Sequence, residues 1–276
     1  MTDAQHIRNL LWLIVSVLEV LFFAFLLVRR FYRSHPIFFL YAFSLVLQTA
    51  TVAMSVQLWG DKGFGYWYTA WISQALVIGM RWSAIAEITR KILGGYSGIW
   101  RLANVVLFVL SIFVLVYALW TSHITLDLAV LSADRGVELC IAVFVVVMFG
   151  FARYYRLPVP DLEKQMAIGF CLYSCAWVVN DTIVDMAVRA APEKWAQSLG
   201  ATWDLFLSAA FIASLTLWTR AIHVARRVPV ADENAPTEPV RLTSEHYARL
   251  SEEVSSRLTL LNHRLNHLLG SKDSRP

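Results

Sequence analysis

Four acidic residues lie inside or next to long apolar stretches of the sequence, where a charge is expensive and is a functional candidate by default. They are Glu138, Asp181, Asp185 and Asp204. Asp181 and Asp185 are spaced so that a helix places both carboxylates on one face. Carboxylates held close together can bind a proton, an amine or a small cation. We therefore predict an outward-facing acidic cup made of these four residues. The alternative is simple packing, because small and hydroxyl side chains surround the acids and are common where helices touch in lipid.

A second set of polar residues lies near the middle of two other apolar stretches. Glu19 and Arg81 have opposite charges and similar depth, so we expect an ion pair between them in the interior. Gln74 precedes Arg81 by two helical turns on the same face. The pair is either a structural clamp between helices or the part of a switch that contacts a ligand.

Near the end of the sequence, residues 260–269 read Leu-Leu-Asn-His-Arg-Leu-Asn-His-Leu-Leu. The segment 261–267 resembles the phospho-acceptor box of sensor histidine kinases, in which His-Arg and a hydrophobic residue precede polar residues that include Asn. The resemblance implies a bacterial sensor-type membrane protein with His263 as the acceptor. Asn266 and His267 replace the usual Lys-Asn pair and no ATP-binding domain follows, so kinase activity is not predicted. The simplest alternative for His263 and His267 is a solvated face of an amphipathic helix, and a metal site in a dimer is a further one.

The composition limits the class of protein that can hold these residues. Apolar residues make up 58% of the 276-residue chain and charged residues 16%, against about 45–50% and about 25% in a soluble domain. A soluble fold of this composition could not cover its surface with polar groups. The net charge of +4 sits in short clusters between apolar stretches, so it does not indicate nucleic-acid binding. The lipid bilayer is the expected surrounding.

Seven apolar stretches are long enough to cross a bilayer as helices, which takes about 20 residues each. The fold class is therefore all-α, an integral membrane bundle of seven transmembrane helices. The predicted spans are residues 10–28, 37–58, 67–89, 102–120, 134–152, 166–188 and 203–222.

The links between the spans set their direction. Basic residues gather after the first, third, fifth and seventh spans, as in Arg29, Arg30 and Arg33. Such residues stay on the cytoplasmic side, so the N-terminus is predicted outside and the C-terminus in the cytoplasm. The expected location is the cell inner membrane or the plasma membrane, with a multi-pass protein.

The remaining sequence divides after the transmembrane domain, which we place at 1–227. A proline-containing linker covers 228–242, an amphipathic cytoplasmic helix 243–269 and a disordered end 270–276. Apolar residues recur at helical spacing along the helix. They include Leu250, Val254 and Leu261, which would pair with a second copy or a cytoplasmic partner, or lie on the membrane surface.

No motif for catalysis or for a bound cofactor is present. The lysines lie outside the spans, which excludes a retinal Schiff base, and so do the histidines, which argues against intramembrane haem. We therefore predict no enzyme activity, no cofactor and no metal. The leading expectation is a receptor-like sensory module that responds to a small cationic ligand or to pH and signals through its tail. A transporter or channel for a cation or small solute is the alternative, and a structural subunit of a larger membrane complex is the third.

Overall fold

The structure is a computed structural model in which every described element is a helix. Seven α-helices and one short 3-10 helix follow one another along the chain. They are α1 (Asp3–Val28), η1 (Phe31–Arg33), α2 (Pro36–Trp59), α3 (Phe64–Leu93), α4 (Ser97–Thr121), α5 (Leu126–Tyr154), α6 (Asp161–Ala190) and α7 (Glu193–Ala225). The described residues are 3–60, 63–94, 97–121, 126–154, 157, 159–190, 193–225 and 256–264. The all-helical class predicted from the sequence is confirmed.

One α-helix covers each of the seven apolar ranges. By length and composition, five are able to cross a membrane: α1, α2, α4, α5 and α7. These five helices indicate an integral membrane protein. Helices α3 and α6 are each 30 residues long but carry more polar residues, which lowers their hydropathy. Among the polar side chains of these two helices, Arg81 on α3 and Ser174 on α6 are buried in the interior.

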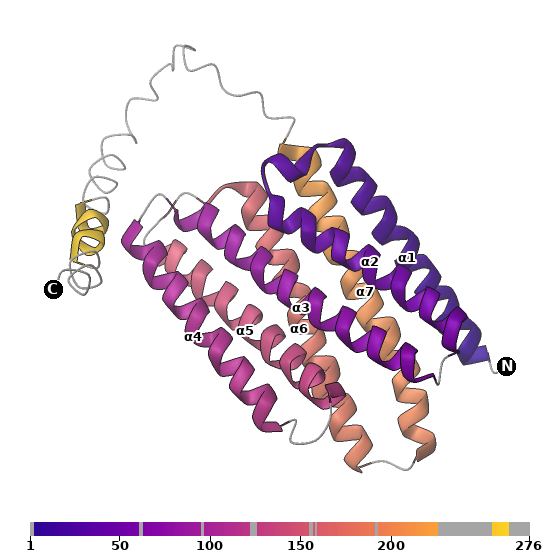
Figure 1. The fold of residues 1–276 in the computed structure, drawn as a ribbon. Helices are drawn as coiled ribbons and strands as arrows, with labels where there is room; N and C mark the ends of the chain where they lie inside the picture. The colour runs from indigo at the N-terminus through magenta and orange to yellow at the C-terminus, as the bar shows by residue number, and fades with distance from the viewer. Residues whose placement is uncertain are drawn as a thin grey trace.

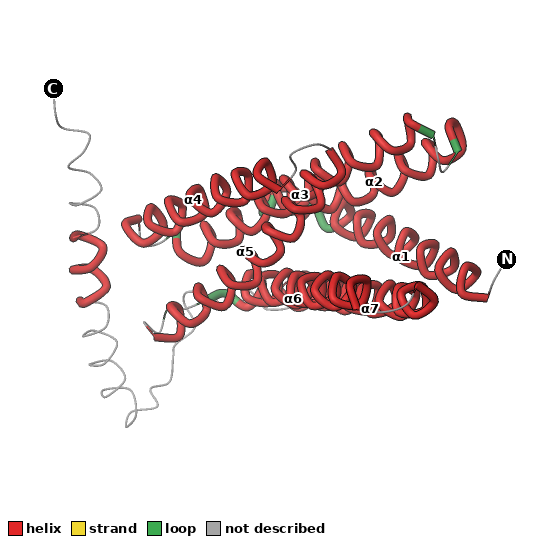
Figure 2. Tube along the Cα trace, turned by 90° about the horizontal axis from the view of Figure 1, so that it is seen from below, coloured by secondary structure: helices red, strands yellow, loops and turns green. Residues whose placement is uncertain are grey.

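The helices form a closed ring with α3 drawn toward its centre. Each helix packs against its neighbours in the sequence, and α7 returns to contact α1. Figure 2 shows α2, α3 and α4 in one row and α6 and α7 in the other, with α5 and α1 joining the rows at opposite sides. Helix α3 also contacts α5 and α6 across the ring. Side chains from α3, α5 and α6 can therefore meet inside the bundle.

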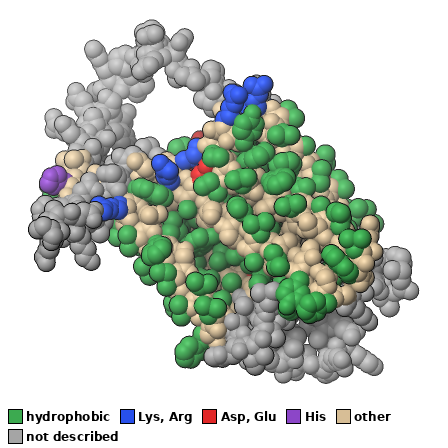
Figure 3. Space-filling model, viewed as in Figure 1, with side chains coloured by type: hydrophobic (Ala, Val, Ile, Leu, Met, Phe, Trp, Pro, Cys, Tyr) green, Lys and Arg blue, Asp and Glu red, His purple; other side chains and the backbone are tan. Residues whose placement is uncertain are grey.

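The surface of the bundle is as apolar as its core. Phe108, Phe113 and Trp120 on α4 are all well exposed, and hydrophobic side chains cover most of the described surface in Figure 3. Water would not stabilise such a surface, whereas lipid tails solvate it. Several ionisable side chains, among them Glu19, Arg81 and Glu138, are instead buried, which is the pattern expected of helices that cross a membrane.

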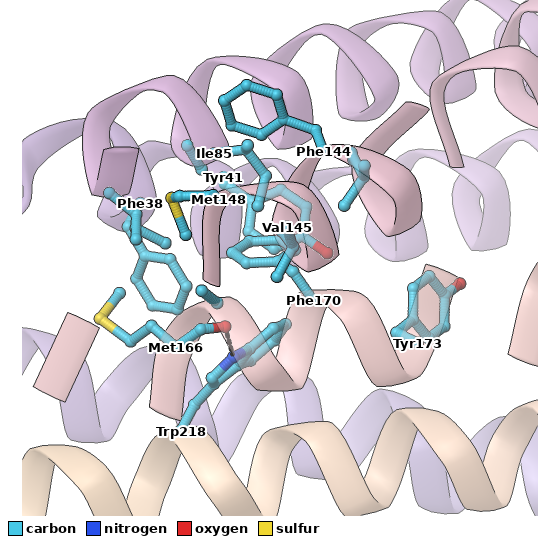
Figure 4. Packing of buried hydrophobic residues seen from close by; sticks show 14 of the residues in the cluster. Phe38, Tyr41, Ile85, Phe144, Val145, Met148, Met166, Phe170, Tyr173 and Trp218 are labelled. Carbon is cyan, nitrogen blue, oxygen red and sulfur yellow. Dashed lines mark hydrogen bonds between the residues drawn. The ribbon is translucent and has the colours of Figure 1, made fainter. Parts of the chain in front are cut away.

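An aromatic core joins the first helices of the chain to the last ones (Figure 4). The ring of Trp218 on α7 contacts Phe22 from α1, Phe38 and Tyr41 from α2, and Phe170 from α6. Its indole N–H donates to the backbone carbonyl of Met166 at 3.0 Å. Aromatic pairs contribute beyond the area that they bury, so this cluster holds α1, α2, α6 and α7 together.

A tight turn between α1 and α2 forms one end of the bundle, which we call the His35 end. Arg30 has a left-handed backbone with φ 54°, which ends α1 and starts η1. The chain re-enters the bundle at Pro36, the first residue of α2, where a missing N–H does no harm. The carboxylate of Glu87 on α3 accepts the N–H of Phe38 at 2.8 Å. A neighbouring helix thus caps α2 with a negative group where its dipole favours one.

Of the predicted tail helix, residues 256–264 are described and are helical. Leu258 is buried, Leu261 is half-buried and His263 is exposed. Leu250, Val254 and His267 lie outside the described residues, as do the predicted linker and the end at 270–276.

Candidate functional site

The central feature of the interior is a cluster of three charged side chains, which we call the Arg81 cluster. Arg81 on α3 points at α5, where its Nη1 contacts Glu138 Oε1 and lies 3.5 Å from Asp134 Oδ1. Asp134 and Glu138 are one turn apart on α5, so both carboxylates face the same way. The exposed fractions of the three residues are 3% for Arg81, 2% for Asp134 and 0% for Glu138. One guanidinium therefore serves two carboxylates away from solvent.

Two tyrosine rings complete the surroundings of the guanidinium. Arg81 Cζ lies 5.0 Å from the ring centre of Tyr173 on α6 and 5.9 Å from that of Tyr41 on α2. The negative face of an aromatic ring attracts a cation, and more strongly where water is absent. The rings partly replace the hydration that Arg81 lacks, so α2 and α6 also help to hold the charge.

Hydrogen bonds extend the Arg81 cluster across four helices. Ser174 on α6 donates its hydroxyl to Glu138 Oε2, and Gln74 on α3 donates to Asp134 Oδ2 at 2.9 Å. The side-chain amide of Gln48 on α2 donates in turn to Gln74 Oε1. A continuous chain of polar contacts thus runs from α2 through α3 and α5 to α6. Buried charges are tolerated when they are paired and their remaining lone pairs are satisfied.

The predicted ion pair between Glu19 and Arg81 is wrong. Glu19 on α1 instead accepts the hydroxyl of Thr49 on α2 at 2.7 Å. Helix α2 lies between α1 and α3, and no contact joins α1 to α3 in the described part of the chain. Arg81 faces the opposite way, toward α5. The placement of Gln74 beside the charged group is correct, although its partner is Asp134.

One residue of the predicted acidic cup, Glu138, lies in the interior instead of facing outward. Glu138 is enclosed by Arg81 and Ser174 and does not line an outward-facing surface. The side chains of Asp181, Asp185 and Asp204 lie outside the described residues, so the rest of the cup stays a prediction. Nearby on α6, Asn180 is 8% exposed and its side-chain carbonyl has no hydrogen-bond partner among the residues described.

Sequence reasoning did not single out Asp134, Tyr41 or Tyr173. Asp134 is the first residue of the predicted span 134–152, and its spacing of four residues from Glu138 is the signal that both acids share one helix face. The two tyrosines gave no such signal, because aromatic residues are common throughout the spans. Only the packing of α2 and α6 against α3 brings their rings to Arg81.

A separate polar contact lies at the His35 end. The ring of His35 stacks on Phe31 at 4.5 Å between centroids, and its Nε2 lies 3.3 Å from Glu163 Oε1 at the start of α6. Burial alone would raise the pKa of Glu163. The contact with the His35 side chain, a backbone hydrogen bond and the charges of His35 and Lys91 outweigh burial and lower the pKa of Glu163 below its usual 4.5. The ionised form of Glu163 thus fastens the turn before α2 to α6.

The depressed pKa of Glu163 predicts an acid-sensitive contact. A carboxylate with a lowered pKa stabilises the fold above its usual pKa, and this contribution disappears as the pH falls through the folded value. We expect Glu163→Gln to lower the free energy of unfolding by about 1–2 kcal/mol at pH 7 and to flatten its pH dependence below pH 4.5. Denaturant titration in detergent micelles between pH 3 and pH 7 measures both effects. Asp161→Asn, an exposed position two residues earlier on α6, is the matched control. An equal loss of slope in the control would contradict the assignment.

Within the described residues, no group of three or more His, Cys, Asp and Glu side chains is placed to hold a metal ion. No protein-family model, curated protein or solved structure matches the chain. The function is therefore argued from the side chains of the Arg81 cluster. Arginine stays protonated in proteins, so the groups of this cluster that can exchange a proton or bind a cation are its carboxylates.

Proposed function

We propose that the protein is a receptor-like sensory module of the membrane. Its sensing element is the Arg81 cluster, and its stimulus is a proton or a small cation. The observation that carries this proposal is that two carboxylates one turn apart share a single buried guanidinium. A structural ion pair that only holds α3 against α5 needs a single carboxylate for the one guanidinium, so a purely structural role does not explain the second carboxylate. Ionisable groups inside membrane helices are rare, and they mark proton relays, ion pathways and ligand sites.

The shared guanidinium supplies two alternative arrangements, which a switch requires. Arg81 Nη1 contacts Glu138, and Asp134 lies 3.5 Å away on the preceding turn of α5. A proton or cation that neutralises Glu138 weakens its hold on Arg81, and the guanidinium then shifts toward Asp134. The hydrogen bonds from Ser174 and Gln74 pass this shift to α6 and, through Gln48, to α2. The tyrosine rings of Tyr41 and Tyr173 accommodate the guanidinium in either position.

The wider architecture follows from the same proposal. Helices α3 and α6 match the other helices in length and pack among them, so we propose that they also cross the membrane, which gives seven spans. The basic links support a topology with the N-terminus outside and the C-terminal helix in the cytoplasm. Asp181, Asp185 and Asp204 would form the outward approach to the Arg81 cluster. The tail helix would carry the signal to a second copy or to a cytoplasmic partner.

Hydrogen exchange of the full chain in lipid nanodiscs tests the sensing element. We expect a shift from pH 7.5 to pH 5.5, or addition of a small cation such as Na⁺, to change amide exchange in α3, α5 and α6 by about fivefold or more. Glu138→Gln should abolish the change, because its side chain neither titrates nor attracts a cation. Glu19→Gln removes another buried acid outside the Arg81 cluster and should leave the change intact. An unchanged wild type, or the same response in Glu138→Gln, would refute the proposal.

Transport of a proton or cation is the second candidate, favoured by the continuous polar chain from Gln48 to Ser174 across the interior. Flux in proteoliposomes separates the two. A flux that disappears in Glu138→Gln would assign transport, whereas a conformational response without flux would assign sensing.

A further inference from the structure

An open cavity of about 500 Å³ lies on the surface of the bundle between α1 and α7. We call it the α1–α7 groove. Its wall is mostly apolar and includes Leu18, Leu21 and Phe25 on α1 and Ile212 on α7. Leu21 is well exposed, so the groove opens outward rather than into the Arg81 cluster. In a membrane this position faces lipid.

The groove has the depth of one leaflet. Helices α1 and α7 run in the same direction, since Phe22 lies beside Trp218 and Arg29 beside His223. The wall on α7 extends from Ile212 to His223, which is about 16 Å along a helix at 1.5 Å per residue. Half of the hydrocarbon core of a bilayer is about 15 Å thick. The groove therefore runs from near the middle of the membrane to one face.

The end of the groove at that face is basic. Arg220 and His223 belong to its wall, and Arg29 Nη2 lies 3.2 Å from His223 Nδ1. A guanidinium has only donors, so His223 Nδ1 accepts and its ring proton lies on Nε2. Among the described residues, no carboxylate is within 4 Å of Arg29 or Arg220. In Figure 3 basic side chains gather at the end of the bundle where α1 and α7 finish.

The hydroxyl groups of the groove already donate hydrogen bonds to backbone carbonyls of their own helix, so they do not donate to a ligand. Thr216 donates to the backbone carbonyl of Ile212 and Thr219 to that of Leu215, both at 2.8 Å. The donors left for a ligand at this end are those of Arg29, Arg220 and His223. They match the oxygens of a phosphate, which guanidinium groups bind strongly.

We propose that the α1–α7 groove binds one anionic phospholipid. An acyl chain lies against the apolar wall from Phe25 to Leu18, and the phosphate lies on Arg29, Arg220 and His223 Nε2. The match has two independent parts, a leaflet-deep apolar wall and a basic end without acidic partners. A basic pocket between helices at the cytoplasmic face is the usual setting for bound anionic lipid. This site is distinct from the Arg81 cluster and does not depend on the proposed sensing function.

Native mass spectrometry of the full chain in detergent tests the site by titration with phosphatidylglycerol or with phosphatidylcholine of the same acyl chains. We expect the wild type to hold one phosphatidylglycerol in preference to phosphatidylcholine. The double variant Arg29→Gln with Arg220→Gln should lose about thirty-fold in apparent affinity for phosphatidylglycerol, or about 2 kcal/mol. Leu21→Trp, which fills the apolar wall, should lower binding of the same lipid without changing charge.

The charge-matched control is Arg33→Gln with Arg90→Gln, two exposed basic residues outside the groove wall. We expect this control to bind phosphatidylglycerol within twofold of the wild type. An equal loss in both double variants would show diffuse attraction to the basic face and would overturn the site. If Leu21→Trp bound phosphatidylglycerol as tightly as the wild type, the proposed position of the acyl chain against the apolar wall would be wrong. If the wild type retained both lipids equally, the basic end of the groove would not discriminate an anionic headgroup from a zwitterionic one, and the proposal would be wrong.

Discussion

Replacing Arg81 with Met is expected to lower the free energy of unfolding by about 3–5 kcal/mol, the usual effect of removing one partner from a buried ion pair. The variant leaves Glu138 buried without its cation and Asp134 without this one. Dispersion contacts of the methionine chain replace the packing of arginine but none of its charge. Chemical unfolding in detergent micelles, followed by tryptophan fluorescence, measures the loss. Arg90→Met provides the control, because Arg90 is exposed on the same helix and its replacement should change stability by less than about 0.5 kcal/mol.

A compensating variant separates charge from simple loss of packing. Adding Glu138→Gln and Asp134→Asn to Arg81→Met removes the stranded carboxylates, and we expect it to recover most of the lost stability. Much of the cost of removing one partner of a buried ion pair comes from the charge left without compensation, and the two amides remove that charge. If the triple variant is no more stable than Arg81→Met alone, the electrostatic account of the Arg81 cluster is wrong.

Replacing Gly169 with Ala is expected to destabilise the bundle by about 3 kcal/mol, at the upper end for overpacked cores. A methyl group at Gly169 would collide with the indole nitrogen of Trp218 and would lie 2.9 Å from its Cδ1. The indole cannot move away without losing its hydrogen bond to Met166 and its contact with Phe170. Thermal unfolding of the purified protein in detergent measures the effect.

Gly79→Ala is the matched control for Gly169→Ala. Both glycines lie within long helices, but a Cβ at Gly79 meets nothing within 4 Å. Alanine stabilises a helix interior relative to glycine by about 0.5–1 kcal/mol, so this control should be neutral or slightly stabilising. Combining Gly169→Ala with Trp218→Phe, which removes the colliding nitrogen, should relieve part of the penalty. Equal effects of the two alanines would contradict the close approach of α6 to α7.

The helices were the most predictable part of the structure. Long apolar stretches allow few alternatives to a helix in lipid, and every predicted span lies within one α-helix. The composition predicted where charges would be unusual, and Arg81 and Glu138 are indeed buried. What the sequence could not supply was the partner of each charge. Depth along a helix can be counted from the sequence, but the direction in which a side chain points depends on which helices are neighbours.

The error at Glu19 illustrates this limit. Glu19 and Arg81 have compatible depth and charge, and nothing in their local sequence separates them from Arg81 and Glu138. The order of helices around the ring decides the pairing, because α2 separates α1 from α3 while α5 packs against α3 directly. The aromatic core was invisible for the same reason, since Trp218 meets Phe22 and Phe38 only after α7 returns to α1.

The pairing of Arg81 also sets an order of events during synthesis. In the proposed seven-span topology, translation delivers α3 to the membrane before α5 exists, so Arg81 reaches the bilayer while Asp134 and Glu138 are still to be made. An unpaired arginine at the centre of an inserting helix costs about 2.5–3.5 kcal/mol. In that topology we expect α3 to insert less readily when it first emerges and to be held more firmly once α5 supplies its two acids. We therefore expect a chain stalled after α4 to hold its third helix less firmly than the complete bundle does.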